Sequence, residues 1–142
     1  MDIKDIAGKV IYSSTKVKTV LDLIKEALQI STDLPQANLP GVDLQGLSSG
    51  EHRALRMPGA NLTGANFSMA MLPGSDFAGA NMSQANFFAA RMRNANFANA
   101  NLTGANFIKA DLTNANFENA NLMGANFTNC ILQNANMNGA IK

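Results

Sequence analysis

Few residues in this chain could carry out chemistry on their own. The sequence has one histidine, His52, and one cysteine, Cys130. An imidazole beside the Glu51 carboxylate could serve as a general base, and a thiolate could serve as a nucleophile or redox group. A solvated loop histidine and an inert buried thiol are the simpler interpretations, because neither residue has a partner set that would activate it. We therefore expect no catalytic residue.

The same scarcity argues against bound metals and cofactors. One cysteine cannot close an internal disulfide, and one cysteine with one histidine cannot assemble the usual zinc sites. The sequence also lacks a glycine-rich phosphate loop and a helix with paired histidines. We expect no metal site, no cofactor and no enzymatic activity.

Charge and hydropathy exclude further classes. The chain has 142 residues, 15% of them charged, and a formal net charge of +1. A protein that neutralises nucleic-acid phosphates needs clustered cations in excess, so we expect no direct nucleic-acid binding. No run approaches the roughly 18 apolar residues that would span a bilayer, and the first residues lack a cationic leader. We expect a cytoplasmic protein without membrane contact.

The elements that must position any functional residue come from a five-residue repeat. A large apolar residue, here called the centre, recurs every fifth position in 16 consecutive units. A small residue stands two positions before each centre; it is alanine except at Ser75 and Cys130. The centres are Leu62, Phe67, Leu72, Phe77, Met82, Phe87, Met92, Phe97, Leu102, Phe107, Leu112, Phe117, Leu122, Phe127, Leu132 and Met137.

This period fits neither a helix nor an ordinary strand. Positions five apart would spread around a helix and would alternate between the two faces of a strand. A disordered tract would not place large apolar residues at a fixed interval. If each unit forms one side of a four-sided coil, equivalent residues lie 20 positions apart, and the phenylalanines fall into two facing columns. These columns are Phe67, Phe87, Phe107, Phe127 and Phe77, Phe97, Phe117, Met137.

The units of the form Ala-Asn-Leu/Phe-x-x, from about Met57 to Ile141, resemble the pentapeptide repeat proteins. The resemblance implies an all-β solenoid, a right-handed quadrilateral parallel β-helix. It also implies possible functions, because some members imitate DNA and bind DNA gyrase, and several dimerise through their C-terminal coils.

Asparagine dominates the position before each centre, where its amide can bond to a nearby turn or form a ladder with the next coil. We interpret these residues as structural. They are Asn61, Asn66, Asn81, Asn86, Asn96, Asn101, Asn106, Asn116, Asn121, Asn126 and Asn136.

The chain divides into an N-terminal cap, residues 1–32, and a repeat region, residues 33–142, with a break in the repeat within 45–56. Lys9–Ser13 is predicted to be a short strand. A helix is predicted from Thr15 to about Gln29, capped by Ser14 or Thr15. A partner-binding or membrane-surface role for this helix is the alternative to capping. Its apolar stripe is Val17, Val20, Leu21, Ile24 and Leu28.

The other end of the solenoid has no comparable cap in this sequence. Open backbone edges and exposed core residues at a terminal coil favour association. We predict a homodimer through the C-terminal coils, with the candidate contact residues Phe127, Leu132, Met137 and Ile141.

Departures from the repeat mark one candidate binding surface. Met71, Arg91 and Ile131 replace the expected Asn or Asp on one side, where Asp111 is predicted to pair with Arg91. The neighbouring outward positions also carry unusual residues. We define the Phe88 corner as Met69, Met71, Phe88, Arg91, Arg93, Ile108 and Lys109. Exposed aromatic, Met and Arg residues are typical of protein contacts, whereas neutral drift of a tolerant surface is the competing interpretation.

Three functions remain open at this point. The first is a non-enzymatic interaction or scaffold module that presents the Phe88 corner to a protein partner. The second, by resemblance, is a DNA mimic that binds gyrase, which the charge disfavours because residues 57–142 contain only three acidic residues against four basic ones. The third is a phage or pathogen protein that disarms a host factor.

Overall fold

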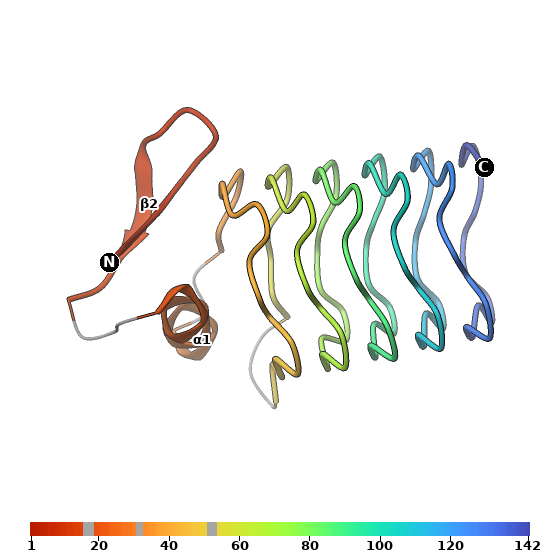
Figure 1. The fold of residues 1–142 in the computed structure, drawn as a ribbon, viewed down its shortest axis with the longest axis horizontal. Helices are drawn as coiled ribbons and strands as arrows, with labels where there is room; N and C mark the ends of the chain where they lie inside the picture. Colours follow the sequence, from red (N-terminus) through yellow and green to blue (C-terminus); the bar gives the residue numbers. More distant parts are fainter. Residues whose placement is uncertain (16–18, 31–32, 51–53) are drawn as a thin grey trace.

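The repeat region forms a solenoid of stacked coils, and the N-terminal segment lies at its first coil (Figure 1). Each coil has four sides, because four bridging positions recur every 20 residues. The computed structural model describes residues 1–15, 19–30, 33–50 and 54–142. Parallel bridges join each side of a coil to the same side of the next, for example Asn66 to Asn86 and Asn86 to Asn106. The predicted spacing of 20 residues between equivalent positions is therefore confirmed.

The core consists of the predicted columns of centres with a wall of small residues. Phe87 and Phe107 stack with ring centroids 4.7 Å apart and an interplanar angle of 4°. Across the interior, Phe107 meets Phe117 edge to face at 5.8 Å. Both the stacked and the edge-to-face arrangements are favourable for aromatic rings. The alternation of aliphatic and aromatic centres in the sequence thus fills the square interior.

Three extra residues interrupt the register at one place. Bridges pair Asn38 with Asn61 and Ser48 with Met71, both 23 positions apart, whereas Arg56 pairs with Asp76, 20 positions apart. The additional residues therefore lie between Ser48 and Arg56. Within this interval, residues 51–53 are outside the part of the chain that the structure describes.

The cap contains two strands and one helix. Strand β1 (Asp2–Lys4) pairs antiparallel with β2 (Val10–Ser13), which matches the predicted strand closely. Sequence analysis did not predict β1, although the backbone at the end of this strand bonds to the first coil of the solenoid. Asn38 N–H donates to the Lys4 carbonyl at 2.7 Å, and Asp5 forms an antiparallel bridge with Ala37. The chain at the end of β1 therefore covers the backbone edge of the first side of the coil, at residues 36–38.

Helix α1 (Val20–Gln29) buries its apolar face in the same core as the first coil. The predicted start at Thr15 is wrong, as is the proposed cap at Ser14 or Thr15. Thr19 is the N-cap, and its Oγ1 accepts a hydrogen bond from the Asp22 N–H at 3.0 Å. Both Thr15 and Thr19 are suitable capping residues, so composition alone did not discriminate between them. The buried helix residues are Leu23, Ile24, Ala27 and Leu28, while Val17 of the predicted stripe is outside the described residues.

The stacked rings generate the first prediction. Phe107→Asp should abolish cooperative folding, because an unpaired carboxylate buried between Phe87 and Phe127 costs several kcal/mol, roughly 3–5 by analogy with broken buried pairs. Circular dichroism and urea denaturation would measure the loss. Phe107→Leu, which keeps an apolar side chain, is the matched control and should stay folded. If the urea concentration at the midpoint of unfolding were the same for Phe107→Asp as for the wild type, the columnar core would be contradicted.

Candidate functional site

Of the two residues considered for catalysis, only Cys130 lies in the part of the chain that the structure describes. His52 lies outside the described residues. Burial raises the pKa of the Cys130 thiol, which leaves it protonated and weakly nucleophilic at neutral pH. Among the residues that the structure covers, no group of three or more His, Cys, Asp or Glu side chains could hold a metal ion. Within the same ranges, no helix is long and apolar enough to cross a membrane.

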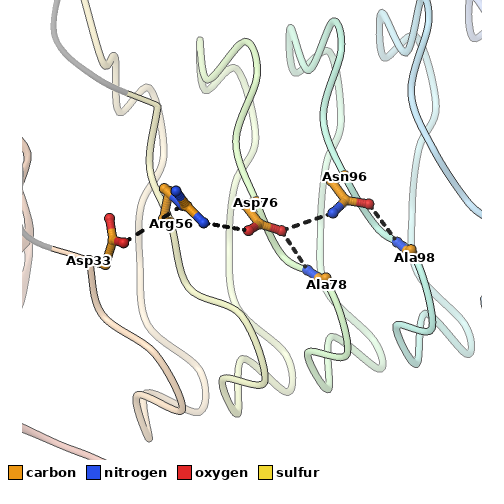
Figure 2. Close-up of polar contacts among 6 residues, drawn as sticks. All are labelled: Asp33, Arg56, Asp76, Ala78, Asn96 and Ala98. Atoms are coloured by element: carbon orange, nitrogen blue, oxygen red, sulfur yellow. Dashed lines mark hydrogen bonds and ion pairs between the residues drawn. The ribbon is translucent and has the colours of Figure 1, made fainter.

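The asparagines before the centres bond both within a coil and between coils. Each Oδ1 accepts from the backbone N–H two positions later, as Asn96 does from Ala98 at 3.1 Å. In eight of the eleven, the Nδ2 also donates to the equivalent residue of the preceding coil, as Asn96 does to Asp76 at 3.0 Å (Figure 2). Arg56 pairs with the same Asp76, at 3.3 Å, and with Asp33, at 3.8 Å. The amide ladder therefore fixes both the turn within a coil and the contact between coils.

One of the four sides lacks this amide ladder. On the side whose core column includes Leu112, here called the Leu112 face, the bridging residues are Ser48, Met71, Arg91, Asp111 and Ile131. None of the five has an amide side chain, so the bridging position of this side lacks the bonds between coils that Asn side chains supply elsewhere. What replaces them is a row of outward side chains at consecutive coils. One amide bond between coils remains at the following turn, where Asn114 Nδ2 donates to Asn94 Oδ1 at 3.2 Å.

The turn leading into the Leu112 face departs from the repeat as well. The second residue after each centre has a positive φ in all 16 units, and it is Gly or Asn in all but four. Three of those four exceptions occupy this one corner: Met69 at 57°, Ala89 at 53° and Lys109 at 61°. A left-handed conformation costs a residue with a Cβ about 1 kcal/mol or more. The side chains at this corner therefore destabilise the backbone conformation relative to Gly or Asn at the same positions.

These departures surround a groove of about 740 Å³. It brings together four of the predicted corner residues, Met71, Arg91, Arg93 and Lys109, with Ile131 at its far end. The full lining is Met71, Pro73, Ala89, Ala90, Arg91, Arg93, Lys109, Asp111 and Ile131. Ile131 was visible in the sequence as a departure from the repeat, but it was not assigned to the candidate surface.

The remaining corner residues differ in exposure. Met69 is 54% exposed, whereas Phe88 and Ile108 are half-buried. The Lys109 Nζ lies 5.7 Å from the centroid of the Phe88 ring, within cation–π range. Phe88 thus supports the cation at the rim of the groove and presents only part of its ring to solvent.

The predicted ion pair between Arg91 and Asp111 is wrong. Asp111 Oδ2 pairs with Arg93 Nε at 2.6 Å instead. The Thr113 N–H and hydroxyl both donate to Asp111 Oδ1, which turns the carboxylate toward the side of the turn where Arg93 lies. Arg91 has no polar side-chain partner among the described residues, so its guanidinium is available to a ligand.

This arrangement shifts the titration of Asp111. Partial burial raises the pKa of Asp111, but the hydrogen bonds from Thr113 and Arg93 outweigh it and hold the pKa below its ordinary value. The carboxylate is therefore charged at neutral pH and already occupied by Arg93. The groove keeps an uncompensated positive charge.

The C-terminal end exposes part of the apolar core. Phe127, Leu132 and Met137 are half-buried, and Ile141 is 55% exposed. The first three, with Leu122 and Ala125, line a hollow of about 290 Å³ at this end. The structure therefore places the four predicted contact residues at the last coil, while their role in a dimer stays a prediction.

Comparison with known proteins agrees with the fold. A model described as "Pentapeptide repeat region" matches residues 55–127, and one described as "Pentapeptide repeats (8 copies)" matches residues 120–141. The chain is thus a repeat solenoid of the right-handed quadrilateral β-helix class. It belongs to the pentapeptide repeat family.

Solved structures of three pentapeptide repeat proteins illustrate the likeness. Rfr23 of the cyanobacterium Cyanothece is 27% identical, with 86% of this chain and 95% of that chain covered and a TM-score of 0.78. HetL of the cyanobacterium Nostoc, involved in heterocyst differentiation regulation, is 30% identical, with 78% and 48% covered and a TM-score of 0.58. A protein of the Arabidopsis thaliana thylakoid lumen is 34% identical, with 70% and 64% covered and a TM-score of 0.57. A search of the curated proteins returned no significant match.

The Asp111 carboxylate generates a pH prediction. Asp111→Asn should lower the free energy of unfolding at neutral pH by about 1 kcal/mol or less, because the pair with Arg93 is near the surface. The folded pKa is below the ordinary 3.8, so the contribution is present above that value and is lost as the pH falls through the folded pKa. The difference between wild type and variant should therefore shrink below about pH 4. Urea denaturation across a pH series would measure it, and a difference independent of pH would contradict the assignment.

Proposed function

We propose that this pentapeptide repeat protein is a non-enzymatic interaction module that presents the Phe88 corner to a protein partner. The observation that carries the proposal is the coincidence of two departures at this corner. The bridging positions of the adjoining Leu112 face lack the amide ladder, and three of the four turn residues in the 16 units that are neither Gly nor Asn lie beside it. Each departure forgoes local stability, and a functional surface is the usual reason for retaining such a cost.

The composition of the corner supports a protein as the partner. Within the corner, Met69 and Met71 are exposed, and Met71 lines the groove together with Arg91 and Lys109. Methionine and arginine are enriched at protein interfaces. The stacked coils beneath the corner hold it rigid, which lowers the entropy cost of binding. Among the described residues, the arrangement of titratable groups gives a catalytic role no comparable support.

The DNA-mimic alternative has less support. Imitation of a phosphate backbone requires a row of free carboxylates along one side. Of the three acidic residues in 57–142, Asp76 is paired with Arg56 and Asp111 with Arg93, which leaves Glu118. This charge distribution favours the interaction module over a gyrase-binding mimic.

A pull-down with two variants tests the proposed corner. Phe88→Ser with Ile108→Ser should leave the melting temperature nearly unchanged, because neither side chain belongs to the buried columns, and should abolish capture of the partner from a lysate of the source organism. Ala98→Ser with Glu118→Ser changes the equivalent positions on the opposite side and serves as the control. A protein that the wild type and the control capture, but the Phe88/Ile108 variant does not, supports the proposal. Identical capture by all three would overturn it.

Self-association through the C-terminal coils is a separate proposal. In earlier coils the backbone N–H of a centre donates to a carbonyl of the following coil, as Phe107 N–H does to the Asn126 carbonyl at 2.8 Å. Phe127 and Leu132 are centres of the last coil, and their side chains are half-buried. A second copy placed there by a two-fold axis would bury this surface. Sedimentation should give a dimer for the wild type and a monomer for Leu132→Arg, with Asn94→Arg on the same face as control. A wild-type monomer at high concentration would contradict the dimer.

A further inference from the structure

We propose that the groove beside the Phe88 corner binds an extended segment of a partner protein, in which an acidic residue is flanked at two positions on either side by apolar residues. This inference rests on the proposed function and specifies its ligand. The recognition sequence is apolar-x-acidic-x-apolar, with the segment parallel to the solenoid axis.

The positive charge of the groove favours an acidic residue at the centre of the bound segment. The groove is lined by three cations, Arg91, Arg93 and Lys109, and by one carboxylate, Asp111. The Asp111 carboxylate is already paired with Arg93, and Arg91 has no polar side-chain partner among the described residues. A guanidinium left free in a concave site is suited to a bidentate contact with an incoming carboxylate.

Apolar residues mark the two ends of the groove. Met71 and Pro73 lie at one end and Ile131 at the other, with Met71 42% and Ile131 50% exposed. Met71, Arg91, Asp111 and Ile131 are consecutive bridge partners on the Leu112 face. Three steps of about 4.8 Å separate the apolar ends by about 14 Å. A ligand must therefore supply two apolar side chains at about this separation.

The geometry of an extended chain matches these positions. Extended residues rise about 3.3 Å each, and alternate side chains point to the same face, so residues i and i+4 span about 13 Å. Residue i+2 then lies about 6.6 Å from the first, between the rung of Arg91 at about 4.8 Å and the rung of Lys109 and Asp111 at about 9.6 Å. A carboxylate at this central position lies within reach of both Arg91 and Lys109. A helix, at about 1.5 Å per residue, would need nine or ten residues for the same span.

Titration with short synthetic peptides tests this proposal. The probe contains Leu-Ser-Glu-Ser-Leu between Gly-Ser ends, and the control peptides contain Leu-Ser-Lys-Ser-Leu and the respaced Leu-Glu-Ser-Ser-Leu. Amide chemical shifts of the 15N-labelled full chain report the site and the dissociation constant. The glutamate peptide should shift the amides of Met71, Arg91 and Ile131 and bind at least tenfold more tightly than either control. Equal binding of the three peptides, or shifts confined to another face, would overturn the proposal.

A charge reversal provides the matched variant. Arg91 is exposed, so Arg91→Glu should fold with an unchanged melting temperature, and it should now prefer the lysine peptide to the glutamate peptide. Gln133→Glu adds negative charge to the same face outside the groove and should keep the wild-type preference. An Arg91→Glu variant that still prefers the glutamate peptide would contradict the central contact.

Failure of this inference can be separated from failure of the proposed function. If the peptides do not bind the groove while the Phe88/Ile108 variant still loses its captured partner, the corner is an interaction surface with a different ligand. If the glutamate peptide binds but the variant captures the same proteins as the wild type, the groove recognises the segment and the proposed role of Phe88 and Ile108 in partner binding is wrong.

Discussion

The parallel bridges between coils are the constraint on which the structure depends. From Arg56 onward each joins residues 20 positions apart, such as Asn86 to Asn106 inside the repeat and Arg91 to Asp111 on the Leu112 face. The same register sets the phenylalanine rings 4.7 Å apart and the Asn86 and Asn106 amides within 3.0 Å. Core packing and surface chemistry thus share one geometric origin, and a shift of one residue would place polar side chains inside the coil.

Each five-residue unit separates its buried positions from its surface positions, which explains why the surface of one side can vary. The centre and the small residue two positions before it are buried, whereas the residue preceding the centre and the two following it form the surface. Met71, Arg91 and Ile131 therefore replace ladder residues without changing the core, because Leu72, Met92 and Leu132 keep their columns. A solenoid of this kind tolerates a specialised surface on one side while the remaining sides maintain its stability.

Sequence periodicity predicted the columns, their spacing of 20 residues and most of helix α1, since these depend on regular burial, and the family resemblance supplied the right-handed quadrilateral shape. It did not predict β1, because three residues that pair with β2 and lead into the bridge from Asp5 to Ala37 carry no periodic signal. It also assigned Asp111 to the wrong arginine, because the rotation of a carboxylate by Thr113 is visible only in three dimensions. Departures from the repeat located the candidate surface, but burial was needed to show that Ile131 is exposed and Phe88 is half-buried.

The amide ladders have a direction. In each observed rung the Nδ2 of the later residue donates to the earlier one, as in Asn116 to Asn96 and Asn136 to Asn116, and the carboxylates Asp43 and Asp76 accept without donating. A finished coil therefore offers ready acceptors to the coil synthesised after it. Since ribosomes release the N-terminal end first, this polarity suits winding that proceeds with translation, one turn upon another.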